Sequence, residues 1–213
     1  MFRNLTPVTK NILILNVVFY LASNFIQFPK LYEMFSVYYI ESPYFRVWQV
    51  ITHMFMHAPL QGGGGLTHIL FNMITLLSFG PVLEQVLGER KYIILYFISG
   101  IGAYLLNCGW NYFEIIQGAD PELIYNIPMM GASGAIFGVV AAFSTLFPDA
   151  KLFFFFIPFP IKAKYLFPGI IVISLYLGFS GSMGGIAHFA HIGGAIVGFI
   201  LARAWKNDLY RYH

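Results

Sequence analysis

Residues 131–147 read GASGAIFGVVAAFSTLF, a run without a single charged side chain. A helix that crosses the hydrocarbon core of a membrane needs about 20 mostly apolar residues, and this run comes close to that length. Five other stretches of the chain have the same character. The sequence therefore predicts an all-α polytopic membrane protein with six transmembrane helices, at residues 11–28, 66–87, 92–108, 131–147, 165–179 and 186–204.

The composition of the whole chain supports this interpretation. Of the 213 residues, 58% are hydrophobic and 10% are charged, whereas about a quarter of the residues in a soluble domain are charged. A water-soluble fold is thereby excluded, and residues 1–213 are expected to form a single domain embedded in a lipid bilayer. The single cysteine, Cys108, cannot close an intramolecular disulfide. The net charge of +3 is too small to indicate binding to nucleic acid.

The basic residues divide unevenly between the two sides of the predicted helices. Cytoplasmic loops of membrane proteins carry an excess of Lys and Arg. Here only Lys30 and Arg46 fall on one side, so the other side, with both termini, is predicted to be cytoplasmic. The first helix is interpreted as retained, because no convincing signal-peptidase site follows it. The cytoplasmic basic residues are Arg3, Lys10, Arg90, Lys91, Lys151, Lys162, Lys164, Arg203, Lys206 and Arg211.

A few strongly polar side chains lie within the predicted helices, where polarity costs free energy and indicates function. His68 and Asn72 are four residues apart and therefore share one helix face. Ser133 and His191 lie near the starts of the fourth and sixth helices. Because the second, fourth and sixth helices all begin on the outer side, these four side chains are expected at one depth, in the outer third of the membrane.

Glycine spacing predicts that the fourth and sixth helices approach closely. Gly134 and Gly138 form one G-x-x-x-G step, and Gly194 and Gly198 form another; such steps let helix backbones come together. That approach would bring Ser133 to His191. The alternatives are that the serine bonds its own helix, that the histidine makes an ordinary interhelical hydrogen bond, and that the glycines serve packing alone.

Serine and histidine together are the minimum for nucleophilic acyl transfer, in which the imidazole takes the hydroxyl proton and later returns it to the leaving amine. The oxyanion needs donors, which His68, Asn72 and the Ser133 backbone N–H can supply. No acidic residue has a pattern that aims it at His191, so the sequence predicts a dyad. Phe137, one turn below Ser133, can stack on the His191 ring; the alternative is an ordinary core or lipid-facing aromatic.

These residues, in this order, resemble the rhomboid intramembrane serine proteases of the bacterial type. The shared motifs are H-x-x-x-N at 68–72, G-x-S-G at 131–134 and A-H-x-x-G-x-x-x-G at 190–198, and Glu84 with Gly88 is similar to the family's E-x-x-x-G step. The resemblance implies a rhomboid-like six-helix bundle. It also implies that Ser133 is the nucleophile, that His191 is the general base and acid, and that His68, Asn72 and the Ser133 N–H form the oxyanion hole. The supporting residues are Gly131, Gly134, Phe137, Gly194 and Gly198.

The resemblance further implies cleavage, without a cofactor, in or beside the transmembrane segment of single-span membrane proteins. It places the protein in the inner (plasma) membrane of a bacterium, with the site facing outward. The rival functions are a catalytically silent chaperone on this scaffold and a small transporter. A transporter is expected to show repeated halves or broken midplane helices, and the sequence has neither.

Two departures from the family concern the first outer loop. Trp48 is followed by Gln49 where the family often has arginine, and the interval from His57 to His68 (HAPLQGGGGLTH) is longer than usual. His53 and His57, four apart, also raise the alternative of a metal site. No glutamate follows His53 or His68, as a zinc protease motif would require. No metal is therefore expected, and His53, His57 and His188 are assigned to hydrogen bonds of the loops and outer surface.

The stretch LFFFFIPFPI at 152–161 is too short to cross a membrane and contains two prolines. It is interpreted as an interfacial cytoplasmic loop anchored by Lys162 and Lys164. A re-entrant element is the alternative.

Overall fold

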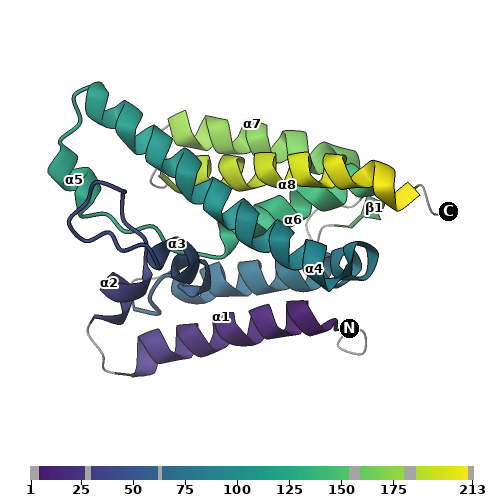
Figure 1. The fold of residues 1–213 in the computed structure, drawn as a ribbon, viewed down its shortest axis with the longest axis horizontal. Coiled ribbons are helices and arrows are strands. Elements are labelled where there is room, and N and C mark those ends of the chain that lie inside the picture. Colours follow the sequence, from purple (N-terminus) through teal and green to yellow (C-terminus); the bar gives the residue numbers. More distant parts are fainter. Residues whose placement is uncertain (1–4, 27–29, 62–63, 154–158, 180–185, 211–213) are drawn as a thin grey trace.

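The computed structural model describes residues 5–26, 30–61, 64–153, 159–179 and 186–210. Within them, each of the six predicted apolar stretches is helical, and the helices form one elongated bundle (Figure 1). The prediction of an all-α architecture is confirmed apart from one two-residue strand pair. Residues 180–185, between the fifth and sixth predicted helices, and residues 154–158 of the 152–161 stretch lie outside the described residues.

Helix α1 (Pro7–Phe25) lies along one side of the bundle, against the first part of α4 (Figure 1). Its first turn starts with a proline and is capped by a neighbouring helix. The Glu84 carboxylate accepts the backbone N–H groups of Val8 and Thr9 at 2.9 and 2.7 Å, and the hydroxyl groups of Thr6 and Thr9 as well. A carboxylate satisfies the free N–H groups and the positive end of a helix, so Glu84 ties α1 to α4.

Helix α4 (Gly65–Ile116) joins the second and third predicted helices. Gly88, with φ 77° and ψ 158°, is the single non-helical residue within it, so only one glycine interrupts the helix between the second and third predicted helices. The second part also continues beyond the predicted end at Cys108, as far as Ile116. Gly109 does not end the helix, and the chain leaves it at Gly118, which adopts φ 97°.

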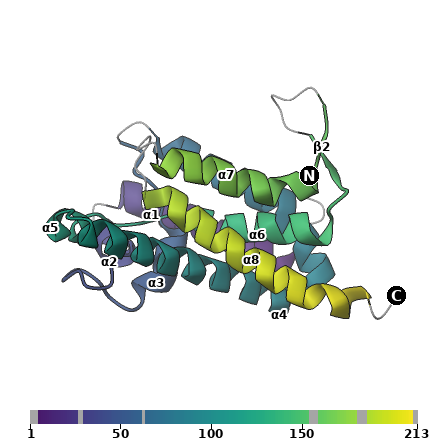
Figure 2. The same ribbon diagram turned by 90° about the horizontal axis from the view of Figure 1, so that it is seen from above.

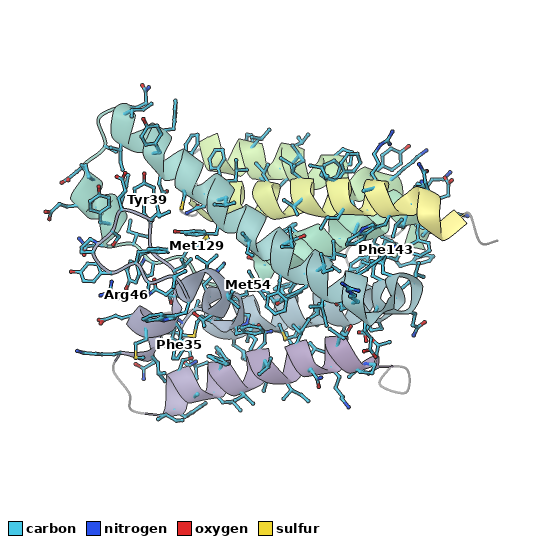
Figure 3. The ribbon with its side chains drawn as sticks, in the orientation of Figure 1. Phe35, Tyr39, Arg46, Met54, Met129 and Phe143 are labelled. Carbon is cyan, nitrogen blue, oxygen red and sulfur yellow. The ribbon has the colours of Figure 1, made fainter. Side chains whose placement is uncertain are left out.

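The first outer loop is held by short helices and by the segment that precedes α6. It contains α2 (Leu31–Phe35), α3 (Gln49–Thr52) and the 3-10 helix η2 (His53–Phe55), and α5 (Pro121–Tyr125) lies at the same end of the bundle (Figure 1). Val37 and Met129 exchange two backbone hydrogen bonds, at 2.9 and 2.7 Å. Figure 3 shows Tyr39, Arg46 and Met129 at this end, with Phe143 near the opposite end.

Helix α6 (Ser133–Leu146) is the central helix and packs against α4 and α8 (Ile186–Tyr210). Most of its side chains are buried. A Cβ atom placed on Gly194 would lie 1.9 Å from the carbonyl oxygen of Gly134, and one on Gly198 would lie 2.1 Å from that of Gly138. The predicted close approach of these two helices is therefore confirmed, with each G-x-x-x-G step seated against the other.

A hairpin of β1 (Lys151–Leu152) and β2 (Ile161–Lys162), followed by the 3-10 helix η3 (Ala163–Tyr165), leads from α6 to α7 (Leu166–Phe179). Helix α7 lies beside α8 (Figure 2). By length and composition alone, α1 and α4 are the described helices that could cross a membrane, whereas α6 and residues 163–176 are shorter apolar helices. The number of six crossings remains a prediction.

Candidate functional site

Ser133 and His191 meet where α6 begins. The Ser133 hydroxyl and His191 Nε2 are 2.9 Å apart, a hydrogen-bond distance. The two residues are 58 positions apart in the chain, and the interlocked glycines of α6 and α8 bring them together. The geometry is that of a hydroxyl nucleophile and its general base.

The His191 ring lies against Phe137, with ring centroids 4.2 Å apart and an interplanar angle of 31°. His188, one turn earlier on α8, meets it edge-on at 6.1 Å. Within the described part of the chain, no carboxylate is hydrogen-bonded to His191. The imidazole is therefore oriented by an aromatic ring and by the serine itself.

Gly131 brings His68 close to the serine. Its φ of 132° is a conformation that favours glycine. A Cβ atom placed there would lie 3.3 Å from His68 Nε2 and 3.5 Å from Ser133 Oγ. His68 Nδ1 accepts the backbone N–H of Ala58 at 3.3 Å, which leaves the ring proton on Nε2, a nitrogen that lies beside Gly131.

Asn72 lies one turn further along α4 and also borders the site. One N–H of its side-chain amide is used locally, because Nδ2 donates to the carbonyl of His68 at 2.7 Å. Asn72 and Ser133 line the same cavity. The four polar residues that the sequence predicts for the site therefore lie close together. They are Ser133, His191, His68 and Asn72.

His57 and Asn16 pack behind His68, a contact that the sequence did not predict. The His57 ring meets His68 edge-on, with centroids 5.3 Å apart, and its Nε2 lies 2.8 Å from Asn16 Oδ1. Burial lowers the pKa of His57 to about 3, so the ring is neutral. The available signal was Asn16 itself, a buried amide within the first apolar stretch, which the general rule on polar residues in membrane helices would have flagged.

The loop that carries Gly131 is tied to the first outer loop. The N–H of Gly131 donates to the carbonyl of His53 at 2.9 Å, and His53 Nδ1 lies 2.9 Å from the carbonyl oxygen of Gln49. Burial lowers the pKa of His53 to about 4. The neutral ring therefore donates through Nδ1, and the hydrogen bonds expected for His53 and His57 are present.

Gln49, the residue after Trp48, is the centre of this loop. Its side-chain amide donates to the carbonyls of Glu33 at 3.0 Å and Tyr44 at 3.3 Å, and its oxygen accepts the N–H of Arg46 at 2.9 Å. The side chain is almost fully buried. A neutral amide thus meets the hydrogen-bonding needs of this loop without placing a charge inside it.

An apolar cavity of about 390 Å³ opens beside Ser133, between the first part of α4, α6 and α7. Apart from Asn72, Thr75 and Ser133, its walls are hydrocarbon and aromatic rings. Phe137, Leu166 and Ile170 also line a second apolar cavity, of about 580 Å³, between α7 and α8. The walls of the first cavity, which the sequence did not predict, comprise Phe71, Phe79, Ile136, Phe137, Val140, Leu166 and Ile170.

No group of three His, Cys, Asp or Glu side chains could hold a metal ion among the residues that the structure describes. His53 and His57 bond protein groups, as given above. His188 differs, because its Nε2 is buried without a hydrogen-bond partner.

Comparison with known proteins bears on most of the chain. The profile of the Rhomboid domain matches residues 44–206. The chain is 36% identical to the rhomboid protease AarA of Providencia stuartii over 145 residues, covering 65% of this chain and 51% of that protein. It is 33% identical to the mitochondrial rhomboid protein 1 of Saccharomyces cerevisiae, covering 62% and 36%. It is 28% identical to the rhomboid protease GluP of Bacillus subtilis, covering 74% and 26%. The chain therefore spans about half the length of these relatives, or less.

Proposed function

Because the chain belongs to the rhomboid family, whose members are integral membrane proteins, we propose that it is an intramembrane serine endopeptidase with a Ser133–His191 dyad. The observation that carries the proposal is the 2.9 Å contact between Ser133 Oγ and His191 Nε2. Neither a chaperone nor a transporter requires a nucleophile paired with a base, so the rival functions do not explain this contact.

In the proposed reaction, His191 Nε2 takes the proton of the Ser133 hydroxyl as Oγ attacks the carbonyl carbon of the scissile peptide bond. The resulting imidazolium then protonates the leaving amine, and an acyl-enzyme ester remains on Ser133. Water, deprotonated by the same imidazole, hydrolyses the ester and restores the hydroxyl. Phe137 restricts the His191 ring by packing against its face, a role that a triad gives to an acid hydrogen-bonded at the ring edge.

The negative charge on the carbonyl oxygen is assigned to three donors, His68 Nε2–H, the Asn72 amide and the Ser133 backbone N–H. The tautomer of His68 supports its role, because the hydrogen bond from Ala58 to Nδ1 keeps the proton on Nε2. Loss of one oxyanion donor in a hydrolase costs about a hundredfold to a thousandfold in rate. His68 and Asn72 variants are therefore expected to retain the fold and lose most of the activity.

We place the chain in the membrane as a single domain with six crossings, both termini in the cytoplasm and the site open to the outer side. The proposed location is the inner (plasma) membrane of a bacterium. The length of α6 supports a position of Ser133 within the membrane, below its outer surface. Its 14 residues span about 21 Å, less than the hydrocarbon core of about 30 Å, so Ser133 would lie below the outer surface.

The proposed substrate is a single-span membrane protein that enters from the bilayer. The apolar cavity between α4 and α7 supports this route, because it reaches Ser133 and would accept apolar side chains near the scissile bond. A helical peptide hides its carbonyl groups in its own hydrogen bonds. Substrates that contain helix-breaking or small residues at the cleavage point should therefore be cut fastest.

The test is cleavage of a single-span protein in liposomes by the wild type, Ser133→Ala and His191→Ala. Both variants are expected to lose at least about a thousandfold in rate, and a fluorophosphonate should label the wild type at Ser133. Chelators should have no effect. Equal cleavage by either alanine variant, or loss of activity on chelation alone, would contradict the proposal.

A further inference from the structure

The β1–β2 hairpin lies at the opposite end of α6 from Ser133 and projects from the bundle (Figure 2). Its base is firmly held. Beyond the strand pair, Ala163 N–H donates to the carbonyl of Ala150 at 2.8 Å and Lys164 N–H to that of Pro148 at 2.9 Å. The Ser144 hydroxyl of α6 donates to the carbonyl of Ala163 at 2.7 Å. The backbone of this base is therefore held in a fixed position relative to α6.

Three lysines gather at this base. Lys151 lies directly opposite Lys162 across the strand pair, and Lys164 follows two residues later. Like charges directly opposite each other destabilise a strand pair. One carboxylate is close by, because Asp149 pairs with Lys162 at 3.1 Å, but both partners are substantially exposed and such a pair is weak. The base keeps an excess of positive charge that an anion would neutralise.

Two other cations at this end of the bundle, Lys206 and Lys91, contact the protein. Lys206 donates to the carbonyl of Thr145 at 3.1 Å, and the Lys91 ammonium lies 5.7 Å from the centre of the Trp205 ring. The side chains of Lys151, Lys162 and Lys164, by contrast, are exposed. The hairpin base differs from the rest of this end because it brings three exposed lysines together on one strand pair and the turn that follows it.

Large aromatic side chains stand next to the lysines and face outward. Phe153 directly follows β1 and Phe159 lies two residues before β2; they are 78% and 62% exposed, and Tyr165 is 59% exposed. The Lys164 ammonium lies 5.3 Å from the centre of the Tyr165 ring. Aromatic rings beside lysines are the arrangement that proteins use at the boundary between lipid headgroups and acyl chains.

We propose that the hairpin base binds the phosphate headgroup of an anionic phospholipid through Lys151, Lys162 and Lys164, with Phe153, Phe159 and Tyr165 in the adjoining acyl region. The ligand is a lipid, because a free phosphate would leave the aromatic rings exposed. The inference rests on the membrane location of the proposed function and not on the serine dyad. The two can therefore fail separately.

The test counts phosphatidylglycerol molecules bound to the full chain in neutral detergent, by native mass spectrometry during a lipid titration. The test variant is Lys151→Gln/Lys162→Gln/Lys164→Gln. Each lysine near an anionic surface contributes severalfold to lipid affinity, so this variant should bind at least about tenfold more weakly. The matched control, Lys10→Gln/Arg90→Gln/Arg203→Gln, removes three exposed charges from the same predicted side that do not belong to the hairpin base, so its loss of affinity should be clearly smaller than that of the hairpin variant.

Equal losses in the two triple variants, or unchanged binding in the first, would overturn the hairpin site. Phe153→Ser/Phe159→Ser, which keeps the lysines, should also bind the lipid more weakly, and unchanged binding would overturn the role of the aromatic rings. Excess inorganic phosphate should not displace the lipid; full displacement would identify a phosphate site instead. Ser133→Ala should bind the lipid as the wild type does, which separates this result from any failure of the dyad. Thermal melting in neutral detergent checks the fold of each variant.

Discussion

Gly131 is the residue of the site where backbone conformation and surrounding space most clearly oppose a substitution. A Gly131→Ala chain must hold a side chain at φ 132° and fit its methyl group 3.3 Å from His68 Nε2 and 3.5 Å from Ser133 Oγ. Such backbone strain costs about 1–3 kcal/mol and would move the two polar groups apart. We expect a loss of about tenfold to a hundredfold in the rate of peptide cleavage. Gly109→Ala is the control, because nothing lies within 4 Å of its added methyl group; an equal loss there would contradict this account.

Gln49 gives a second prediction at this scale. Gln49→Ala leaves the carbonyls of Glu33 and Tyr44 and the N–H of Arg46 without their buried partner. A hydrogen bond contributes about 0.5–1.5 kcal/mol net to stability, so the loss of all three should clearly lower the melting temperature in detergent. Gln85→Ala, at an exposed position of α4, should leave it nearly unchanged. If the two variants melt alike, Gln49 does not hold the loop.

At the scale of the element, the interlocked helices α6 and α8 determine whether the dyad exists at all. In Gly198→Ala the new methyl group would lie 2.1 Å from the carbonyl oxygen of Gly138, so the helices must separate. Overpacking of this kind costs about 1–3 kcal/mol or more. Both the melting temperature and the fluorophosphonate labelling of Ser133 should fall. Gly169→Ala on α7, where the added methyl group meets nothing within 4 Å, should change neither.

The helices also show which structural features can be predicted from the sequence. Glycine spacing predicted the contact of α6 with α8, because the short i, i+4 pattern is readable along one chain. The end of α4 at Ile116 was missed, because residues 109–116 combine apolar and polar side chains and tertiary packing decides such a stretch. The cavity walls from α4 and α7 were missed for a related reason. They depend on how three distant helices are placed relative to one another, which no local pattern encodes.

For the whole molecule, the two buried histidines of the outer loop make stability depend on pH. Burial lowers the pKa of His53 to about 4 and that of His57 to about 3, whereas an unfolded histidine titrates near 6.5. Between these values the unfolded chain binds protons that the folded chain does not, so stability is full above about pH 6.5 and falls as the pH drops. At about pH 5 each histidine should cost roughly 2 kcal/mol.

The measurement is the melting temperature in detergent between about pH 7.5 and pH 5, for the wild type and for His57→Gln. The glutamine variant carries a neutral side chain that does not titrate, so its melting temperature should fall less steeply on acidification, even if it starts lower. Because His57 lies against His68 and bonds Asn16 of α1, its protonation would loosen α1 and the proposed oxyanion hole together. Wild-type cleavage should therefore fail at acid pH before the secondary structure is lost, and parallel slopes for the two proteins would refute the role of His57.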